Sequence, residues 1–412
     1  MSAKTIFSAA DFLLPPYTAN DPAWTKWAVI AVDQFTSEPS YWEKAEAIAK
    51  DAPSALHLVL PEAYLETEAE ASRNAEIQTA MAQMNGGALK EYTDSLLYLE
   101  RTLPDGRVRR GLVGKIDLEK YDYAKGSAPA VRATEATVLE RIPPRVAIRS
   151  AAPLELPHVM LLLNDTNGLM AFVSKNCGAY DCLYDFDLML DGGHAKGFRI
   201  TGDALAAVLA KIAEYESSRE SGFVYAVGDG NHSLAAAKAH YENLKAKEGS
   251  AAADHPARYA LVELVALEDD ALDFEPIYRV VETEDTADFL RALGAITKSG
   301  EGEQTVRVLT ADSDETVSFT APTHALTVGT LQIFIDEYIA AHPGVKCDYI
   351  HDEASLIALA KRKGSVGFLF DGMAKEELFP YVLNHGTLPR KTFSMGEARS
   401  KRYYIEARRI VK

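Results

Sequence analysis

The chain is poor in cysteine, which limits the chemistry of its thiols. Cys177, Cys182 and Cys347 are the only cysteines among its 412 residues. An odd number of cysteines in a long chain argues against a disulfide framework, so we expect reduced thiols. Cys177 and Cys182 lie close together, but no second pair and no histidine-rich tract accompanies them. The sequence therefore argues against a zinc site held by cysteine.

The sequence also lacks any apolar run near the length that a bilayer requires. Its first residues, MSAKTIFSAADFLLPPY, contain no charged segment followed by a long apolar run. We therefore expect neither a secretory signal nor a membrane partner. Together with reduced thiols, these features favour a cytoplasmic protein.

Basic residues are outnumbered in this chain. It contains 43 Lys and Arg against 60 Asp and Glu, which gives a formal net charge of −17 and a pI of about 5.1. Such acidity argues against a nucleic-acid partner. A small-molecule substrate is the expected partner, and the sequence is compatible with an oligomer.

Short apolar runs alternate with helix-forming segments, which predicts an α/β protein with mixed α+β sheets. The turn Pro104–Gly106 predicts a hairpin, and Leu56–Leu60 and Phe172–Lys175 are predicted strands. The elements become shorter in the last third of the chain. We therefore predict a main α/β domain over residues 1–285 and a smaller C-terminal α/β domain with a basic tail over residues 286–412.

The stretch FVYAVGDGNHSLAAAKAHYE is the best-equipped place for chemistry. Its first five residues form an apolar run typical of a buried strand, and the segment from Leu234 consists of strong helix formers. Between them lies GDGNHS, residues 228–233, in which the glycines permit a tight turn. A helix N-terminus after such a turn favours anion binding. The turn also holds a carboxylate, Asp229, and an imidazole, His232.

The segment VRATEATVLERIPPRVAIR is locally basic. Its arginines lie among hydroxyl groups and the carboxylate of Glu135, a pattern that suits phosphate or carboxylate recognition. A surface strand whose arginines pair with surplus acids explains the pattern equally well. The arginines that we consider as phosphate ligands are Arg132, Arg141 and Arg145.

The last 25 residues contain eight basic residues and two acidic ones. Arg390 and Lys391, which precede hydroxyl-bearing residues, are predicted to close over an anion. The other interpretation is a basic strand that docks on the acidic body for stability, and we favour it for Arg408, Arg409 and Lys412.

Two further carboxylates, Asp33 and Asp165, end predicted strands. Loops after strands often carry functional residues. For Asp33, however, capping of the predicted helix Tyr41–Lys50 is the favoured interpretation, because aspartate is a common N-cap. The role of Asp165 stays open.

Several stretches together resemble one uncharacterised family, domain of unknown function one thousand and fifteen. They are WAVIAVDQFTSEPSYW, RATEATVLERIPPR, GDGNHSLAAAK, ARYALVELVAL with EPIYRVV, and LPRKTFSMGEARSKRYY, and they span nearly the whole chain. The resemblance implies no activity, because the function of the family is unknown.

The strand, the Asp-Gly-x-His turn and the helix are also similar, more distantly, to the signature of the ParB and sulfiredoxin-like superfamily. This resemblance implies a ParB/sulfiredoxin-like core and phosphate binding at the turn, because members bind nucleotide phosphates there and some are kinases of free serine. The sequence departs from the superfamily pattern at Ser233, where an arginine is common. An arginine from elsewhere, such as Arg132, Arg141 or Arg390, would then replace it.

These features favour a small-molecule phosphotransferase, most like a kinase of free serine or a related hydroxyl metabolite. Phosphoryl transfer depends mainly on positioning and charge neutralisation. ATP or ADP is the expected donor, and Mg²⁺ is the expected metal, with Asp229 as its ligand. The candidate catalytic residues are Asp229, His232 and, as the base, Glu135. The candidate cofactor-binding residues are Gly228, Gly230, Asn231, Ser233, Arg132, Arg141, Arg145, Arg390 and Lys391.

Two other functions are compatible with the sequence. One is a nucleotide-binding regulatory module without turnover, whose target would be a protein. The other is a phosphoester hydrolase in which His232 acts as acid or base and Asp229 orients it.

Overall fold

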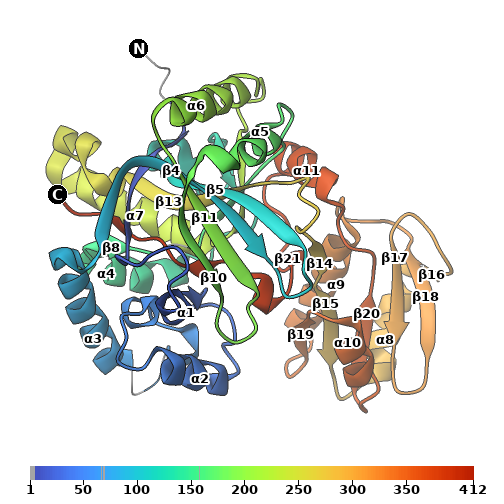
Figure 1. Cartoon of the computed structure of the whole chain (residues 1–412). Coiled ribbons are helices and arrows are strands. Elements are labelled where there is room, and N and C mark those ends of the chain that lie inside the picture. The colour runs from blue at the N-terminus through green and yellow to red at the C-terminus, as the bar shows by residue number, and fades with distance from the viewer. Residues whose placement is uncertain (1–4, 66, 68–69, 157) are drawn as a thin grey trace. The chain divides into compact units, whose positions relative to one another are not determined.

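The computed structural model describes residues 5–65, 67, 70–156 and 158–412 (Figure 1). They form two compact units. Unit 1 contains the residues up to Leu272 together with Glu397–Lys412, and unit 2 contains Asp273–Gly396. The sequence of unit 2 is therefore inserted into that of unit 1.

This division differs from the boundary predicted near residue 285. Strand β14 (Phe274–Pro276) lies at the start of unit 2 and β21 (Phe393–Met395) lies at its end, and these two strands pair with each other. The residues that follow β21 pair with strands of unit 1 instead. Residues 397–412 of the basic tail are thus part of unit 1, whereas the sequence predicts them in the second domain.

An 11-stranded mixed sheet forms the centre of unit 1, which confirms the predicted α/β class. Strands β13 and β9, β12 and β7, and β7 and β6 are parallel, and the other neighbours are antiparallel. Two short strands, β1 (Phe7–Ser8) and β2 (Ala10–Leu14), pair with β5 and β4. The main order is β10 (Asp181–Asp187), β11 (His194–Ile200), β4 (Lys90–Thr102), β5 (Val108–Asp117), β13 (Tyr259–Ala266), β9 (Met160–Leu163), β12 (Tyr225–Asp229), β7 (Val131–Ala133) and β6 (Tyr121–Asp122).

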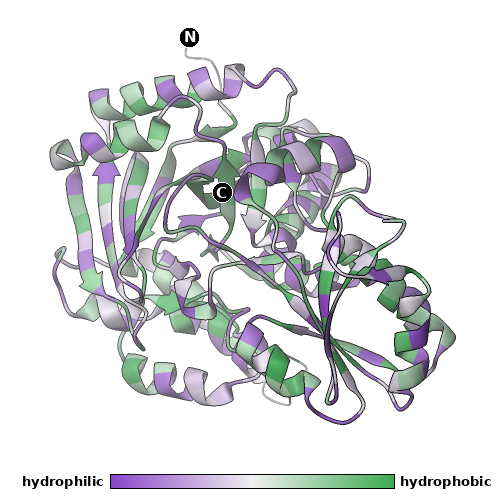
Figure 2. Cartoon of the chain, turned by 90° about the vertical axis from the view of Figure 1, so that its right-hand side faces the viewer, coloured by the Kyte–Doolittle hydropathy of each residue, from purple (hydrophilic) through white to green (hydrophobic). Residues whose placement is uncertain are grey.

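Both faces of this sheet are buried. Successive residues of a strand point to opposite faces. In β4, Leu97 and Leu99 pack in one hydrophobic core, whereas Leu96 and Tyr98 pack in the other. Hydrophobic and hydrophilic residues are interspersed along many other elements of the chain (Figure 2).

Helices cover the two faces (Figure 1). The first core includes residues of α1, α2 and α3, and the second includes residues of α5, α6 and α7. Helix α4 packs against α7. The bounds are α1 (Ala23–Trp27), α2 (Pro39–Ala49), α3 (Glu70–Gln83), α4 (Ile142–Ala151), α5 (Leu169–Lys175), α6 (Gly202–Ser217) and α7 (Asn231–Glu248).

The structure confirms one local prediction and corrects two. Strands β4 and β5 form the predicted hairpin around Pro104–Gly106. Leu56–Leu60 is not a strand, because the Ser54 side chain accepts a hydrogen bond from the backbone of Leu56 and begins a 3-10 helix, Ala55–Leu58. Phe172–Lys175 lies in helix α5. The carboxylate of Asp165 accepts hydrogen bonds from the first two backbone N–H groups of that helix, and so satisfies two donors at its N-terminus.

The tail residues of unit 1 are docked by strand pairing. Strand β22 (Tyr403–Tyr404) pairs with β3 (Val29–Ile30), and β23 (Arg408–Arg409) pairs with β8 (Leu154–Glu155). A β-strand pair of two residues contributes few hydrogen bonds, so other contacts hold the tail. The side chain of Arg402 lies between the buried carboxylates of Glu263 and Glu406, at 2.8 and 2.7 Å.

Unit 2 contains a six-stranded antiparallel sheet with helices on both faces. Its strands follow the order β16 (Thr297–Ser299), β18 (Asp314–Phe319), β17 (Thr305–Leu309), β20 (Ser365–Leu369), β15 (Tyr278–Glu282) and β19 (Lys346–Ile350). The core on one face includes α8 and α9, and a smaller core on the other includes α10. The helices are α8 (Thr286–Gly294), α9 (Thr327–Ala341), α10 (Glu353–Ala360) and α11 (Leu378–His385).

None of the helices in the described part of the chain combines the length and the hydrophobicity needed to cross a membrane.

Candidate functional site

The predicted strand, turn and helix are all present around GDGNHS. Strand β12 ends at Asp229, Gly230 follows, and α7 begins at Asn231. Gly230 has a φ of +80°, and a Cβ placed on it would lie 3.0 Å from the Cα of Val159. Only glycine fits such a position without strain. The N-cap residue of α7 is Gly230, which has no side chain to accept from the first N–H groups of the helix, so the first turn can bind an anion.

Asp229 is held between the turn and the tail. Its Oδ1 accepts a hydrogen bond from the backbone N–H of Gly230 at 2.9 Å, and its Oδ2 lies 3.3 Å from the Nζ of Lys401. The side chains of Asp229 and Lys401 are only 19% and 9% exposed. The tail therefore brings a poorly solvated ammonium group to the turn.

Asn231 places an unsatisfied oxygen in the same turn. The hydroxyl of Thr134 donates to the carbonyl oxygen of Val227 at 2.6 Å, so it can only accept from the amide nitrogen of Asn231, which lies 3.5 Å away. This arrangement fixes the orientation of the amide. Its other atom, Oδ1, is buried and has no hydrogen-bond partner among the described residues. A buried acceptor in this state favours a ligand or water that brings a donor.

Asp33 faces a buried histidine, whereas the sequence favours a helix cap. The N-cap of α2 is Glu38, so the capping interpretation of Asp33 is wrong. Its Oδ2 lies 3.7 Å from the Nε2 of His158, and the Nδ1 of His158 lies 2.7 Å from the hydroxyl of Tyr404. The residues come from the segment after β3, the segment before β9 and the tail, and strand pairing between β3 and β22 brings two of these segments together.

The electrostatics keep Asp33 ionised. Burial raises the pKa of Asp33, but the charge of His158, a hydrogen bond from Gln34 and the charge of Lys401 outweigh burial and lower that pKa below its ordinary value. Burial and the charge of Asp33 raise the pKa of Tyr404, which keeps its proton. Lys401 thus acts on both carboxylates: it pairs with Asp229, and it helps to hold Asp33 in its charged form.

We call Asp33, His158, Asp229, Lys401 and Tyr404, together with the N-terminus of α7, the Asp229 site. All of them belong to unit 1. The site combines two carboxylates, an ammonium group and a helix N-terminus, and Asp33 keeps 31% of its side chain exposed. Chemically, this set can bind an anion and hold a hydroxyl or ammonium group beside it.

The segment that carries Glu135 lies against the turn. Thr134, directly before Glu135, is hydrogen-bonded to Val227, and the backbone N–H of Val138 donates to the Nε2 of His232 at 3.3 Å. Since this nitrogen accepts a hydrogen bond, the proton of a neutral His232 is on Nδ1. Glu135 is half-buried between these two anchor points.

The described contacts of the predicted arginines lie elsewhere. Arg132 donates to the carbonyl of Pro129 and lies over the ring of Phe223, 4.7 Å from its centroid. Arg145 forms an ion pair with Glu62 and donates to the carbonyl of Arg141.

Arg390 and Lys391 belong to unit 2. Arg390 forms an ion pair with Asp336 and donates to the hydroxyl of Tyr349. Lys391 has a φ of +56°, and its carbonyl accepts a hydrogen bond from the buried guanidinium of Arg279 at 2.9 Å.

The donor set around Asp229 does not fit a metal held by protein side chains alone. Both of its oxygens already have partners, one of which is the ammonium of Lys401. The described residues also contain no group of three or more His, Cys, Asp or Glu side chains that could hold a metal ion.

Sequence reasoning missed Lys401, His158 and Tyr404. Lys401 and Tyr404 lie in SKRYY, within one of the stretches that carry the family resemblance. That stretch is a usable signal, although its composition alone favours Arg390 and Lys391 as the anion-binding residues. His158 stands alone in an apolar segment and has no comparable signal in the sequence.

Comparison with known proteins identifies a family but no activity. No curated protein matches the chain. Solved structures that resemble it include a conserved hypothetical protein from Pyrococcus furiosus, at 12% identity, a TM-score of 0.37 and coverage of 69% of this chain and 90% of that one. They also include a free serine kinase in complex with AMP, at 10% identity, a TM-score of 0.38 and coverage of 72% and 90%. A third is SbnI with a C-terminal truncation from Staphylococcus aureus, at 9% identity, a TM-score of 0.36 and coverage of 69% and 82%.

These TM-scores are too low to carry an argument about this chain. The family match is of a different kind, because it covers most of the sequence. Residues 14–363 match the family described as protein of unknown function DUF1015, and the chain belongs to that family.

Proposed function

We propose that this protein is a small-molecule phosphotransferase, most like a kinase of free serine or a related hydroxyl metabolite. The donor is ATP or ADP, and its phosphates bind at the turn of residues 228–233. The observation that carries the proposal is the ammonium group of Lys401 beside Asp229, at the N-terminus of α7, where the N-cap residue is glycine.

Three features support a phosphate at this position. The N-terminus of a helix carries partial positive charge and unpaired N–H groups. Lys401, beside Asp229, adds an ammonium group that can donate to a phosphate, and low exposure strengthens such a charge-assisted hydrogen bond. Gly230 lets the backbone of the turn approach a ligand closely, because it has no side chain.

The carboxylates suit the acceptor side of the reaction. A substrate hydroxyl must lose its proton as it attacks the phosphoryl group. Glu135 is the base proposed from the sequence, and the partly exposed, ionised Asp33 is a second carboxylate in the site. Asp229 positions Lys401, and His232 and Asn231 shape the phosphate-binding turn. The arginines named in the sequence analysis stay candidates for additional phosphate contacts.

The test is a turnover assay with matched variants. Purified protein is incubated with ATP or ADP, Mg²⁺ and a panel of amino acids and polyols that includes serine, and phosphorylated products are measured by ³¹P NMR and mass spectrometry. Lys401→Met should reduce turnover by about 10²-fold or more, because one preorganised charge is lost. Lys247→Met, at an exposed position near the end of α7, is the control and should leave turnover unchanged.

Asp33→Asn and Glu135→Gln separate the two carboxylates. The variant that removes the base should lower kcat far more than it raises KM, whereas removal of a group that only binds substrate raises KM. No turnover with any acceptor would exclude the kinase. Tight nucleotide binding without consumption would favour the regulatory module, and release of phosphate from phosphoserine without nucleotide would favour the hydrolase.

A further inference from the structure

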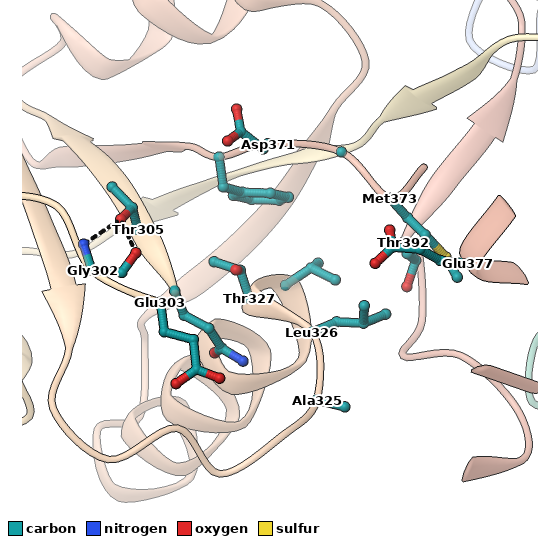
Figure 3. Close-up of a pocket in the computed structure, with 14 residues that line it drawn as sticks. Gly302, Glu303, Thr305, Ala325, Leu326, Thr327, Asp371, Met373, Glu377 and Thr392 are labelled. Atoms are coloured by element: carbon teal, nitrogen blue, oxygen red, sulfur yellow. Dashed lines mark hydrogen bonds between the residues drawn. The ribbon is translucent and has the colours of Figure 1, made fainter. Parts of the chain in front are cut away.

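Unit 2 contains a cavity of about 280 Å³ that the proposed function does not use. It lies where the segment before β17, the segment after β20 and the N-terminus of α9 meet (Figure 3). Glu303 and Thr327 contribute from one side, and Glu377 comes from the segment before α11. This volume suits a small metabolite rather than a nucleotide.

Gln304, which lines the cavity, has an amide oxygen without a partner. The residue is only 5% exposed, and its Nε2 donates to the carbonyl of His324 at 2.7 Å. This bond fixes the orientation of the amide, because the reverse orientation would place two oxygens against each other. Its Oε1 is buried and has no hydrogen-bond partner among the described residues. A ligand that brings an N–H or O–H donor would remove the cost of this unsatisfied acceptor.

The N-terminus of α9 offers the opposite polarity. Its N-cap is Leu326, which has no side chain capable of capping. The N–H groups of Gly329 and Thr330 donate to the carbonyl of Leu326, so the helix uses those two internally. The earlier N–H groups, of Thr327 and Val328, have no helical partner and favour an anionic group.

The charged residues around the cavity are all acidic. Glu303, Asp371 and Glu377 line it, and none of the described lining residues is Lys, Arg or His. Glu377 accepts a hydrogen bond from the backbone of Ala374 through one oxygen. Glu303 and Asp371 are exposed. Three carboxylates in a described lining that contains no basic residue favour a ligand that carries a positive charge.

We propose that unit 2 binds a small zwitterion, a free α-amino acid, in this cavity. The ammonium group of the ligand lies against the acidic residues and donates to the Oε1 of Gln304, and its carboxylate lies at the N-terminus of α9. Each end of such a ligand meets the polarity that suits it. This inference goes beyond the proposed phosphotransferase and does not depend on it, since every residue in the argument belongs to unit 2.

The test is binding to the full-length protein, measured by isothermal titration. The probes are the standard free amino acids, the matching amines that lack the carboxylate, and the matching N-acetylated acids that lack the ammonium. At least one free amino acid should bind, and loss of either charged group should weaken binding by 10-fold or more. Asp371→Asn and Glu303→Gln should weaken it similarly, and as substitutions of exposed residues they should leave the fold intact. The exposed Glu315→Gln, in β18, is the control.

A second comparison separates this cavity from the Asp229 site. Lys401→Met should leave amino-acid binding to unit 2 unchanged, whether or not the protein proves to be a kinase. The proposal is overturned if no amino acid binds, or if the decarboxylated amines bind as tightly as the amino acids. It is also overturned if binding survives both acidic substitutions, or is lost in Lys401→Met.

Discussion

Asn231 is a side chain at which we expect stability and binding to be linked. Its Oδ1 is buried without a hydrogen-bond partner at the start of α7. Leaving a buried acceptor unsatisfied costs about 1–3 kcal/mol. Such a cost is expected at a site where a ligand provides the missing donor. Selection for binding then retains an unsatisfied acceptor that selection for stability alone would remove.

Asn231→Leu should therefore separate the two properties. The variant removes the unsatisfied oxygen and loses only a long contact of 3.5 Å to Thr134. We expect the free energy of unfolding, measured with urea, to stay equal or to rise by about 1 kcal/mol, while affinity for phosphate ligands falls. Thr134→Val is the comparison, because it breaks the 2.6 Å bond to Val227 and should destabilise by about 1 kcal/mol. A loss of stability in Asn231→Leu as large as that in Thr134→Val would contradict this account.

His240 makes stability depend on pH. It lies in α7, and its Nδ1 is 3.0 Å from the hydroxyl of Ser150 in α4. Burial, with smaller contributions from Arg149 and His255, lowers the pKa of His240 to about 4. In the unfolded chain a histidine has a pKa of about 6.5. Between these two values the unfolded state binds the proton and the native state does not, so stability falls as the pH is lowered through that window.

This proton should account for about 3 kcal/mol of stability lost between pH 6.5 and pH 4. His240→Gln, which cannot titrate, should lose less stability over the same range than the wild-type protein. Urea denaturation at several pH values measures the difference between the two curves. Parallel curves would show that His240 is not responsible.

At the residue level, the sequence predicts the turn of residues 228–233 but not the residues that lie around it, such as Lys401. GDGNHS was recognisable because strand formers, glycines and helix formers follow one another locally. Lys401 lies far along the chain from Asp229, and no local pattern connects the two. Asp33 was assigned to a helix cap because aspartate caps are common, but α2 begins at Pro39, after Glu38.

At the level of elements, we expect the buried ion pairs of Arg402 to stabilise the docked tail, residues 397–412, more than the short strands β22 and β23 do. Burial lowers the pKa of Arg402, but the charges of Glu406 and Glu263 outweigh burial and raise that pKa, so Arg402 stays charged. Both carboxylates are fully buried. Lys401 precedes Arg402 directly, so the position of the ammonium at Asp229 depends on this anchor.

Arg402→Met should destabilise unit 1 by about 3–5 kcal/mol, because two buried carboxylates lose the guanidinium group that lies between them. Arg409→Met removes an arginine of the same tail whose ion pair with Glu91 is exposed, and it should cost less than about 1 kcal/mol. Denaturant unfolding of the two variants measures the contrast. Equal losses would show that the tail is held by strand pairing rather than by the buried charges.

Local chemistry also decided which elements were predictable. The hairpin around Pro104–Gly106 has turn residues that specify it, and the structure contains it. Leu56–Leu60 and Phe172–Lys175 are short apolar runs, which do not distinguish strands from helices by periodicity alone. In both cases the structure has helices, whose first backbone N–H groups donate to the side chains of Ser54 and Asp165.

At the scale of the whole molecule, unit 2 is inserted into the sequence of unit 1, and its first and last strands pair with each other. Strands β14 and β21 pair at its two ends, and the rings of Phe274 and Phe393 stack with centroids 3.9 Å apart. The unit has a hydrophobic core of its own. The shorter elements in the last third of the sequence predict a second domain. The return of the chain to unit 1 has no local signal, because it depends on pairing between distant residues such as Ile30 and Tyr403.

Residues 273–396 should therefore fold as an isolated fragment, whereas residues 1–272 should not fold without residues 397–412. Circular dichroism and cooperative thermal unfolding test the first fragment. For unit 1, the comparison is residues 1–272 alone and the same residues joined by a flexible linker to residues 397–412. Cooperative folding of residues 1–272 alone would contradict the role given to the tail.

The inserted order of the two units also has a consequence during synthesis. Asp229 leaves the ribosome long before Lys401, and the whole of unit 2 is made between them. Unit 2 can complete its own fold while unit 1 still lacks β22, β23 and the ammonium group of Lys401. The nascent protein thus has an incomplete Asp229 site until its second unit has been made, so a chain interrupted before residue 401 cannot assemble the site.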